Sequence, residues 1–153
     1  MRMKKAVIAV ILTAVLLYVG IVMANNRIAE DLRKQVADCM LPPGTELVDS
    51  VAVAGKMEGN GNGMQYYGAA LIHSEMDEGP LRVWYEAQLP VADEEYLWVS
   101  RQETPVLFEY QKPRFKDFQD DGHYYCVMLA HNSASGTEDT LWEELLDCDI
   151  RGH

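Results

Sequence analysis

The feature that most constrains this chain is a run of 19 uncharged, mostly apolar residues near its N-terminus, residues 6–24. As a helix rising about 1.5 Å per residue, the run would cover roughly 28 Å, close to the hydrocarbon thickness of a bilayer. Arg2, Lys4 and Lys5 precede the run, and basic flanks favour the cytoplasmic side. We therefore predict a single-pass protein of the cell membrane. Residues 1–5 are expected in the cytoplasm, residues 6–24 as a transmembrane helix, and the remaining chain outside.

A cleaved signal peptide is the alternative for the same segment. Val22, Met23 and Ala24 form a small-x-small site just before the polar Asn25. The apolar run is longer than the roughly 7 to 15 residues of a typical signal-peptide core, which favours a retained anchor. Both interpretations export the rest of the chain.

The helical pattern continues beyond the apolar run, over residues 25–40. Ile28, Leu32 and Val36 recur at a spacing of four and give one apolar stripe. Proline cannot continue a helix, so the pattern ends at Pro42. The sequence thus predicts a stalk helix that extends the membrane helix outward.

The chain after residue 24 is strongly acidic. It carries 10 basic against 24 acidic residues, a formal charge of −14. Such a surface repels phosphate, which argues against nucleic-acid binding and predicts that the domain stands off anionic lipid headgroups. Membrane contact is therefore expected through residues 6–24, with a cationic protein or another envelope component as a compatible partner.

Residues 41–153 are predicted to form one extracytoplasmic α+β domain. Strands are predicted over residues 45–57, 64–73, 96–102, 106–112 and 123–130, with helices starting at Gly79-Pro80 and after Thr137. Residues 58–63 hold two Asn-Gly pairs, which predict an exposed hairpin turn rather than a phosphate-binding loop, because a strand follows. We expect a mainly antiparallel sheet of about five strands with two helices packed on it.

The last predicted helix carries four large apolar residues at helical spacing. These are Leu141, Trp142, Leu145 and Leu146. They are expected to lie in the core against the sheet, so that loss of Trp142 would come close to unfolding the domain. Residues 151–153 show no comparable pattern and are expected to be a frayed end.

Two polar groups are candidates for chemistry. His73 stands two residues from Glu75 at a predicted strand end, and Asp120 and Asp121 precede His123 at another. A zinc site needs three or four converging ligands, and neither a His-Glu-x-x-His nor a Cys-x-x-Cys motif is present. We assign no catalytic, cofactor-binding or metal-binding residue. An envelope hydrolase or metal-dependent enzyme using His73, Asp121 and His123 stays as an alternative function.

The three cysteines favour no catalytic role. Cys126 lies in the most apolar predicted strand, where a thiol is expected to be buried and inert. Cys39 and Cys148 lie near the ends of the first and last helices. They could pair if their Cα atoms came within roughly 7 Å; three free thiols are the main expectation.

Aromatic residues are frequent in the predicted strands and helices. Most are expected to build the core, but in the Tyr66-Tyr67 and Tyr124-Tyr125 pairs one ring points to each face of a strand, so one of each pair is expected to be exposed. The preferred function is a non-catalytic module that binds a protein or envelope component. A structural or assembly subunit that oligomerises through its N-terminal helix is a further alternative.

Overall fold

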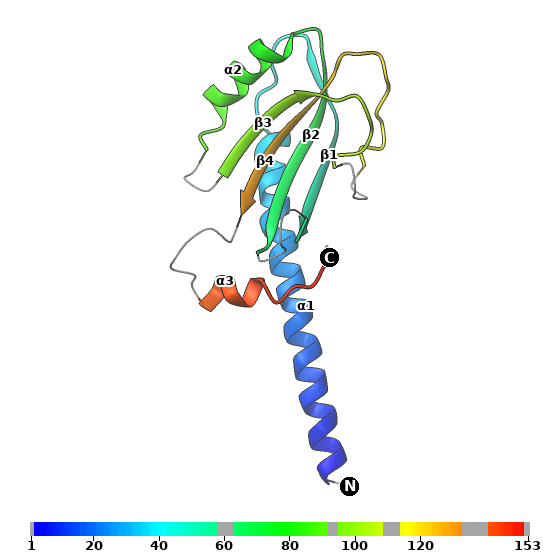
Figure 1. The fold of residues 1–153 in the computed structure, drawn as a ribbon, viewed down its shortest axis with the longest axis vertical. Coiled ribbons are helices and arrows are strands. Elements are labelled where there is room, and N and C mark those ends of the chain that lie inside the picture. The colour runs from blue at the N-terminus through cyan, green and yellow to red at the C-terminus, as the bar shows by residue number, and fades with distance from the viewer. Residues whose placement is uncertain (1, 58–62, 92–94, 109–113, 133–140, 152–153) are drawn as a thin grey trace.

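The computed structural model describes residues 2–57, 63–91, 95–108, 114–132 and 141–151. It begins with one continuous helix, α1 (Arg2–Ala37). The N-terminal part of α1 projects away from the rest of the molecule, whereas its C-terminal part lies behind the sheet (Figure 1). α1 is long and apolar enough to cross a membrane.

Four strands form one antiparallel sheet in the part of the chain that is described. They are β1 (Thr45–Gly55), β2 (Gln65–Ser74), β3 (Glu95–Arg101) and β4 (Tyr124–Asn132), in the order β1-β2-β4-β3. Helix α2 (Glu78–Gln88) joins β2 to β3, and the short helix α3 (Leu141–Leu146) follows β4. The fold is α+β, as the sequence predicted. The predicted turn at residues 58–63 falls largely on 58–62, outside the described residues.

The expected fifth strand over residues 106–112 is wrong for the residues that the structure describes there. Val106 forms one isolated bridge with Arg114, and residues 107 and 108 are in a bend. Leu107 instead packs onto the sheet together with Phe115. Leu107 thus covers a sheet face from a loop rather than extending a sheet edge.

The main core lies between α1 and one face of the sheet. Ala29, Leu32 and Val36 of α1 are buried there against Tyr66, Ile72, Val127 and Leu129, and α2 adds Leu81 and Tyr85. The apolar stripe predicted for a stalk is therefore covered by the sheet. Residues 25–37 act as the central helix of the domain.

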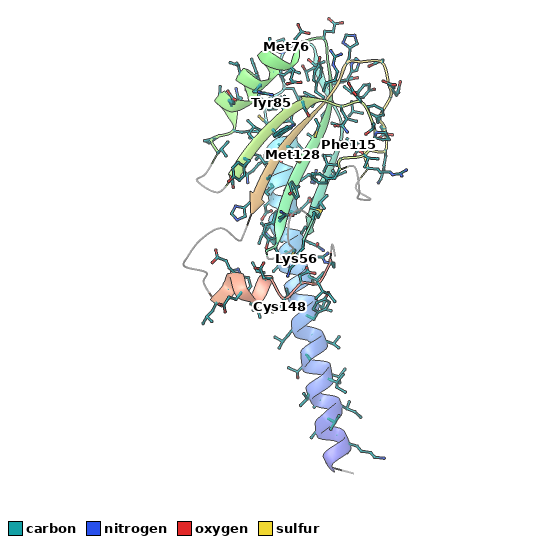
Figure 2. All side chains as sticks on the ribbon, in the orientation of Figure 1. Lys56, Met76, Tyr85, Phe115, Met128 and Cys148 are labelled. Carbon is teal, nitrogen blue, oxygen red and sulfur yellow. The ribbon has the colours of Figure 1, made fainter. Side chains whose placement is uncertain are left out.

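The opposite face of the sheet carries a second, smaller core. Ala69, Leu71, Tyr124 and Cys126 are buried there with Phe115, which reaches over from the connection between β3 and β4 (Figure 2). Because both faces are covered, all four rings of the two tyrosine pairs are buried. The expectation that one ring of each pair is exposed is wrong.

The C-terminal segment packs against α1 and not against the sheet face. Leu146 is buried, whereas Leu141, Trp142 and Leu145 are exposed. The prediction that all four pack in the core is thus wrong for three of them. α3 meets α1 near Asn25, below the end of the sheet (Figure 1), and only one of its turns faces the protein.

Candidate functional site

The structure brings together the polar residues of the predicted alternative site. His73 is at the end of β2, and Asp121 and His123 directly precede β4, its antiparallel neighbour. His73 Nε2 lies 3.1 Å from Asp121 Oδ2, and its Nδ1 lies 3.8 Å from Glu46 Oε1 on β1. The rings of His73 and His123 have centroids 5.9 Å apart. The antiparallel register of β2 and β4 thus brings His73 next to Asp121 and His123, which lie far from it in the sequence.

The carboxylate of Asp121 is the most strongly held group of this cluster. The backbone N–H of His123 donates a 2.9 Å hydrogen bond to Asp121 Oδ1. This hydrogen bond and the contact with His73 hold the pKa of Asp121 below its ordinary value. Asp121 is therefore ionised at neutral pH and orients the His73 ring.

The chemistry that this cluster can perform is limited by what surrounds it. Among the described residues, the ion-pair and hydrogen-bond partners of His73 are two carboxylates, and its ring neighbours are His123 and Tyr124. Nucleophilic catalysis of the Ser–His or Cys–His kind needs a serine, threonine or cysteine beside the imidazole, and none is among these contacts of His73. Across the same residues, no group of three or more His, Cys, Asp or Glu side chains is placed to hold a metal ion. The carboxylates that His73 contacts are those of Asp121 and Glu46 rather than that of Glu75, the neighbour named from the sequence.

The cysteines are free in this structure. Burial raises the pKa of the Cys126 thiol to about 12, so it stays protonated and inert. Cys39 follows the C-terminal end of α1, whereas Cys148 follows α3, which contacts α1 at Asn25. From Asn25 to the end of α1 at Ala37, two residues before Cys39, the helix rises about 18 Å along its axis. A Cys39–Cys148 disulfide would require a different arrangement of the chain.

A second candidate site is an exposed aromatic surface on the edge strand β3. Leu97 and Val99 point to the main core, so Tyr96 and Trp98 point to the other face, where they are 59% and 60% exposed. A cavity of about 270 Å³ lies next to them. It is lined by Trp98, Ser100, Gln102, Leu107, Phe108, Cys126 and Met128. We call Tyr96, Trp98, Leu107, Phe108 and Met128 the Trp98 surface.

Among the described residues, the second core stops short of the β3 edge, which leaves the Trp98 surface exposed. Phe115 and Phe118 pack over β2 and the near side of β4. Phe108 contacts Tyr67 of β2 with ring centroids 4.7 Å apart. Met128 on β4 is half-buried, and β3 beyond it carries Tyr96 and Trp98 without such a cover.

Helix α2 covers part of the β3 edge itself. The Arg82 guanidinium donates a 3.1 Å hydrogen bond to the Val99 carbonyl, and Glu78 accepts one of 3.2 Å from the Arg101 N–H. Arg82 and Glu78 also form an ion pair at 2.9 Å. Charged groups on edge backbone atoms prevent strand addition at that end. The part of β3 that stays available for contact is consequently the face that carries Tyr96 and Trp98.

Sequence reasoning identified Tyr96 and Trp98 as aromatic but did not separate them from the core residues. The alternation of Leu97 and Val99 with Tyr96 and Trp98 was the available signal, since successive strand residues face opposite ways. Leu107 and Phe108 were assigned to a strand, so their place beside Trp98 was not predicted.

Comparison of the chain with protein-family models, with curated proteins and with solved structures finds no match.

Proposed function

We propose that this chain is a membrane-anchored interaction protein whose extracytoplasmic domain binds a cationic partner protein through the Trp98 surface. The observation that carries the proposal is the exposure of Tyr96 and Trp98 side by side on an edge strand, next to an apolar cavity. Tyr and Trp are the residues that most often dominate binding energy at protein interfaces, and Met is also enriched there.

The charge of the domain supports a basic partner. With a formal charge of −14 beyond residue 24, the domain attracts positively charged proteins and repels a second copy of itself. Acidic Glu95 and Glu103 lie close to Trp98 in sequence, at the two ends of β3. A partner that pairs an apolar anchor with surrounding Lys or Arg would fit both features.

The anchor is supported by the exposure of the N-terminal half of α1. Val10 and Leu16 are each about 70% exposed and belong to a helix apolar on all sides, which is the composition of a membrane span. The basic N-terminus supports a cytoplasmic start and an extracytoplasmic domain. Protease added to intact spheroplasts should then digest residues 41–153; protection of that region would reverse the orientation.

The two alternative functions have weaker support. The His73 cluster supplies a histidine and carboxylates, but among the described residues its contacts include no serine, threonine or cysteine and no metal-binding group of three. Oligomerisation through the N-terminal helix is limited to its first part, residues 6–24, because the sheet already covers Leu32 and Val36 in the later part. The geometry therefore favours the binding module.

Site-specific photocrosslinking in native membranes tests the proposed surface. A photoreactive phenylalanine analogue replaces Trp98 in one variant of the full chain and Val83 in the control, because Val83 is equally exposed but lies on α2. We expect one crosslinked basic protein at position 98, weakened by high salt, and none at position 83. Identical patterns at the two positions, or no product at position 98, would contradict the proposal.

A further inference from the structure

Helix α3 is fixed at the level where α1 leaves the predicted membrane span. Asn25, the first residue after that span, is buried and donates hydrogen bonds of 3.1 Å to the Leu146 carbonyl and 3.0 Å to Asp149 Oδ2. Figure 1 shows α3 beside α1 at this level, the chain after α3 crossing α1, and the N-terminal part of α1 projecting beyond both. Any bilayer around residues 6–24 would therefore have its surface close to α3.

The acidic side of α3 faces the sheet. Asp147 Oδ1 accepts a 2.7 Å hydrogen bond from the N–H of Met64, which precedes β2 at the near end of the sheet. Burial of Tyr66, followed by the charges of Asp147, Asp149 and Glu143, raises the pKa of Tyr66. Asp147 is therefore directed at the near end of the sheet, and Glu143, four residues earlier, lies on the same side of the helix.

The apolar side of α3 points away from the sheet. At about 100° per helical residue, Trp142 and Leu145 lie roughly 140° and 160° around the helix from Asp147. Asp147 belongs to the same helical turn, since its N–H donates to the Glu143 carbonyl at 2.9 Å. The side chains opposite the sheet are thus the apolar ones.

These apolar side chains are exposed. Leu141 is 86%, Trp142 58% and Ile150 70% exposed, and Leu145 is exposed as well. The same segment is held firmly elsewhere: Leu146 and Asp149 are buried, and the Lys56 N–H donates a 3.0 Å hydrogen bond to the Arg151 carbonyl. A well-held segment that presents several large apolar residues on one side indicates a contact surface.

We propose that α3 and Ile150 dock on the outer surface of the bilayer that α1 crosses, with Leu141, Trp142, Leu145 and Ile150 in its interfacial region. The inference rests on the proposed anchoring of α1. We assign lipid as the binding partner of this surface because the Asn25 hydrogen bonds hold α3 next to the end of the predicted span, where the bilayer surface would lie. Tryptophan is enriched at this depth, and amphipathic helices bind there with their apolar side inward.

The acidic charge of the domain specifies the lipid. Exposed Glu144 flanks the apolar side of α3, and the whole domain is acidic. Anionic headgroups would repel it, so zwitterionic headgroups are the favourable surface. This placement differs from the expectation that the domain stands off the bilayer, because one short edge of the domain carries apolar rather than charged side chains toward the membrane.

Depth-dependent quenching of tryptophan fluorescence tests the docking. The full chain carrying Trp84→Phe and Trp98→Phe, which leaves Trp142 alone, is reconstituted into phosphatidylcholine vesicles with or without brominated acyl chains. We expect brominated lipid to remove most of the Trp142 emission, because an indole at the headgroup level lies next to the acyl chains. The matched control carries Trp84→Phe and Trp142→Phe, which leaves Trp98, a residue of nearly the same exposure that lies on β3 of the sheet rather than on α3.

Flotation of the same vesicles separates this inference from the proposed anchoring. Quenching of Trp142 without quenching of Trp98 supports the docking. If the chain floats with the vesicles but Trp142 is not quenched, α1 is inserted and the docking is wrong. Equal quenching of both residues would mean that the domain lies on the membrane without α3 as its contact. A chain that does not float overturns both.

Discussion

Gly68 of β2 lies directly against the backbone of Arg33 in α1. A Cβ atom added at Gly68 would lie only 2.6 Å from the Arg33 Cα and closer still to the Arg33 nitrogen. The neighbouring positions on this face, Ala52 on β1 and Ala70 on β2, are also small. The missing side chain at Gly68 therefore sets how closely the helix approaches the sheet, and with it the position of the whole domain on α1.

The first prediction is that Gly68→Ala strongly destabilises the domain. The new methyl group meets the α1 backbone at Leu32 and Arg33, which no rotamer change can relieve, so a loss of about 3 kcal/mol or more in the free energy of unfolding is expected. Gly79→Ala is the control: Gly79 lies in α2 with open space around it, and alanine there should stabilise by about 0.5 kcal/mol or more. Urea unfolding of the full chain in micelles measures both. A small effect at Gly68 would show that α1 can shift on the sheet.

Much of the fold follows from patterns in the sequence, but the closest contact between helix and sheet does not. The stripe of Leu32 and Val36 predicted a helix with one apolar side, and that side is buried. The sequence could not show that the sheet packs on this apolar stripe, because a stalk helix and a core helix have the same apolar periodicity. From the sequence, Gly68 indicates only a destabilising glycine inside a strand. Its role as the point of close backbone approach becomes visible once α1 is placed beside it.

The second prediction contrasts Leu146 with Trp142. Leu146 is 3% exposed and packs where α3 meets α1, so Leu146→Ala should cost about 2 to 5 kcal/mol. Trp142→Ala should change the stability by less than about 1 kcal/mol in micelles, because most of the Trp142 ring is already exposed. Thermal unfolding of the two variants decides the matter. A larger loss for Trp142 would restore the sequence-based expectation that it belongs to the core.

The C-terminal segment shows where sequence reasoning reaches its limit. Helical spacing identified the apolar residues of α3 correctly, yet periodicity cannot say whether an apolar side meets a sheet or another surface. Arg151, expected to be frayed, pairs with Asp149 at 2.6 Å and donates a 2.8 Å hydrogen bond to Asn26. That expectation is wrong for Arg151. Partners more than 120 residues apart in the chain leave no local signal.

For the candidate site the limit is similar. His73 and Asp121 were named as possible partners, and the antiparallel register of β2 and β4 does bring them together. The exposure of Trp98 depended on how far a loop from residue 102 onward extends over the sheet. Composition alone does not determine that reach, because the same aromatic residues suit a core or a surface.

The third prediction concerns the buried amide of Asn25. Tyr66 donates a 2.9 Å hydrogen bond to Asn25 Oδ1, and the Asn25 amide donates to Asp149. Asn25→Ala leaves the buried Tyr66 hydroxyl and part of the Asp149 carboxylate without these partners, at a cost of about 1 to 3 kcal/mol. Asn26→Ala is the control, since Asn26 makes one exposed hydrogen bond to Arg151. Equal melting temperatures for the two variants would contradict a structural role for the Asn25 amide.

The last prediction is that the C-terminal segment is released only in acid. Burial raises the pKa of Asp149, but hydrogen bonds from Arg151 and Asn25 outweigh it, so the pKa lies below the ordinary value of 3.8. A carboxyl whose pKa is lower in the folded than in the unfolded state stabilises fully above its ordinary pKa. That contribution is lost as the pH falls through the folded pKa. The segment should therefore stay docked from neutral pH down to about pH 4 and detach below it.

The Lys56 amide reports this release directly, because it donates to the Arg151 carbonyl. Its NMR shift in the micelle-bound chain should stay constant from pH 7 to about pH 4 and change steeply in stronger acid. Other carboxylates titrate in the same range, so Asp149→Asn is the necessary comparison. Without the Asp149 carboxyl, the Lys56 amide of the variant should show no steep shift change in acid. Sheet amides that respond to other carboxylates should titrate as they do in the unmodified chain. An unchanged step in Asp149→Asn would show that another carboxyl controls the docking, and the assignment to Asp149 would be wrong.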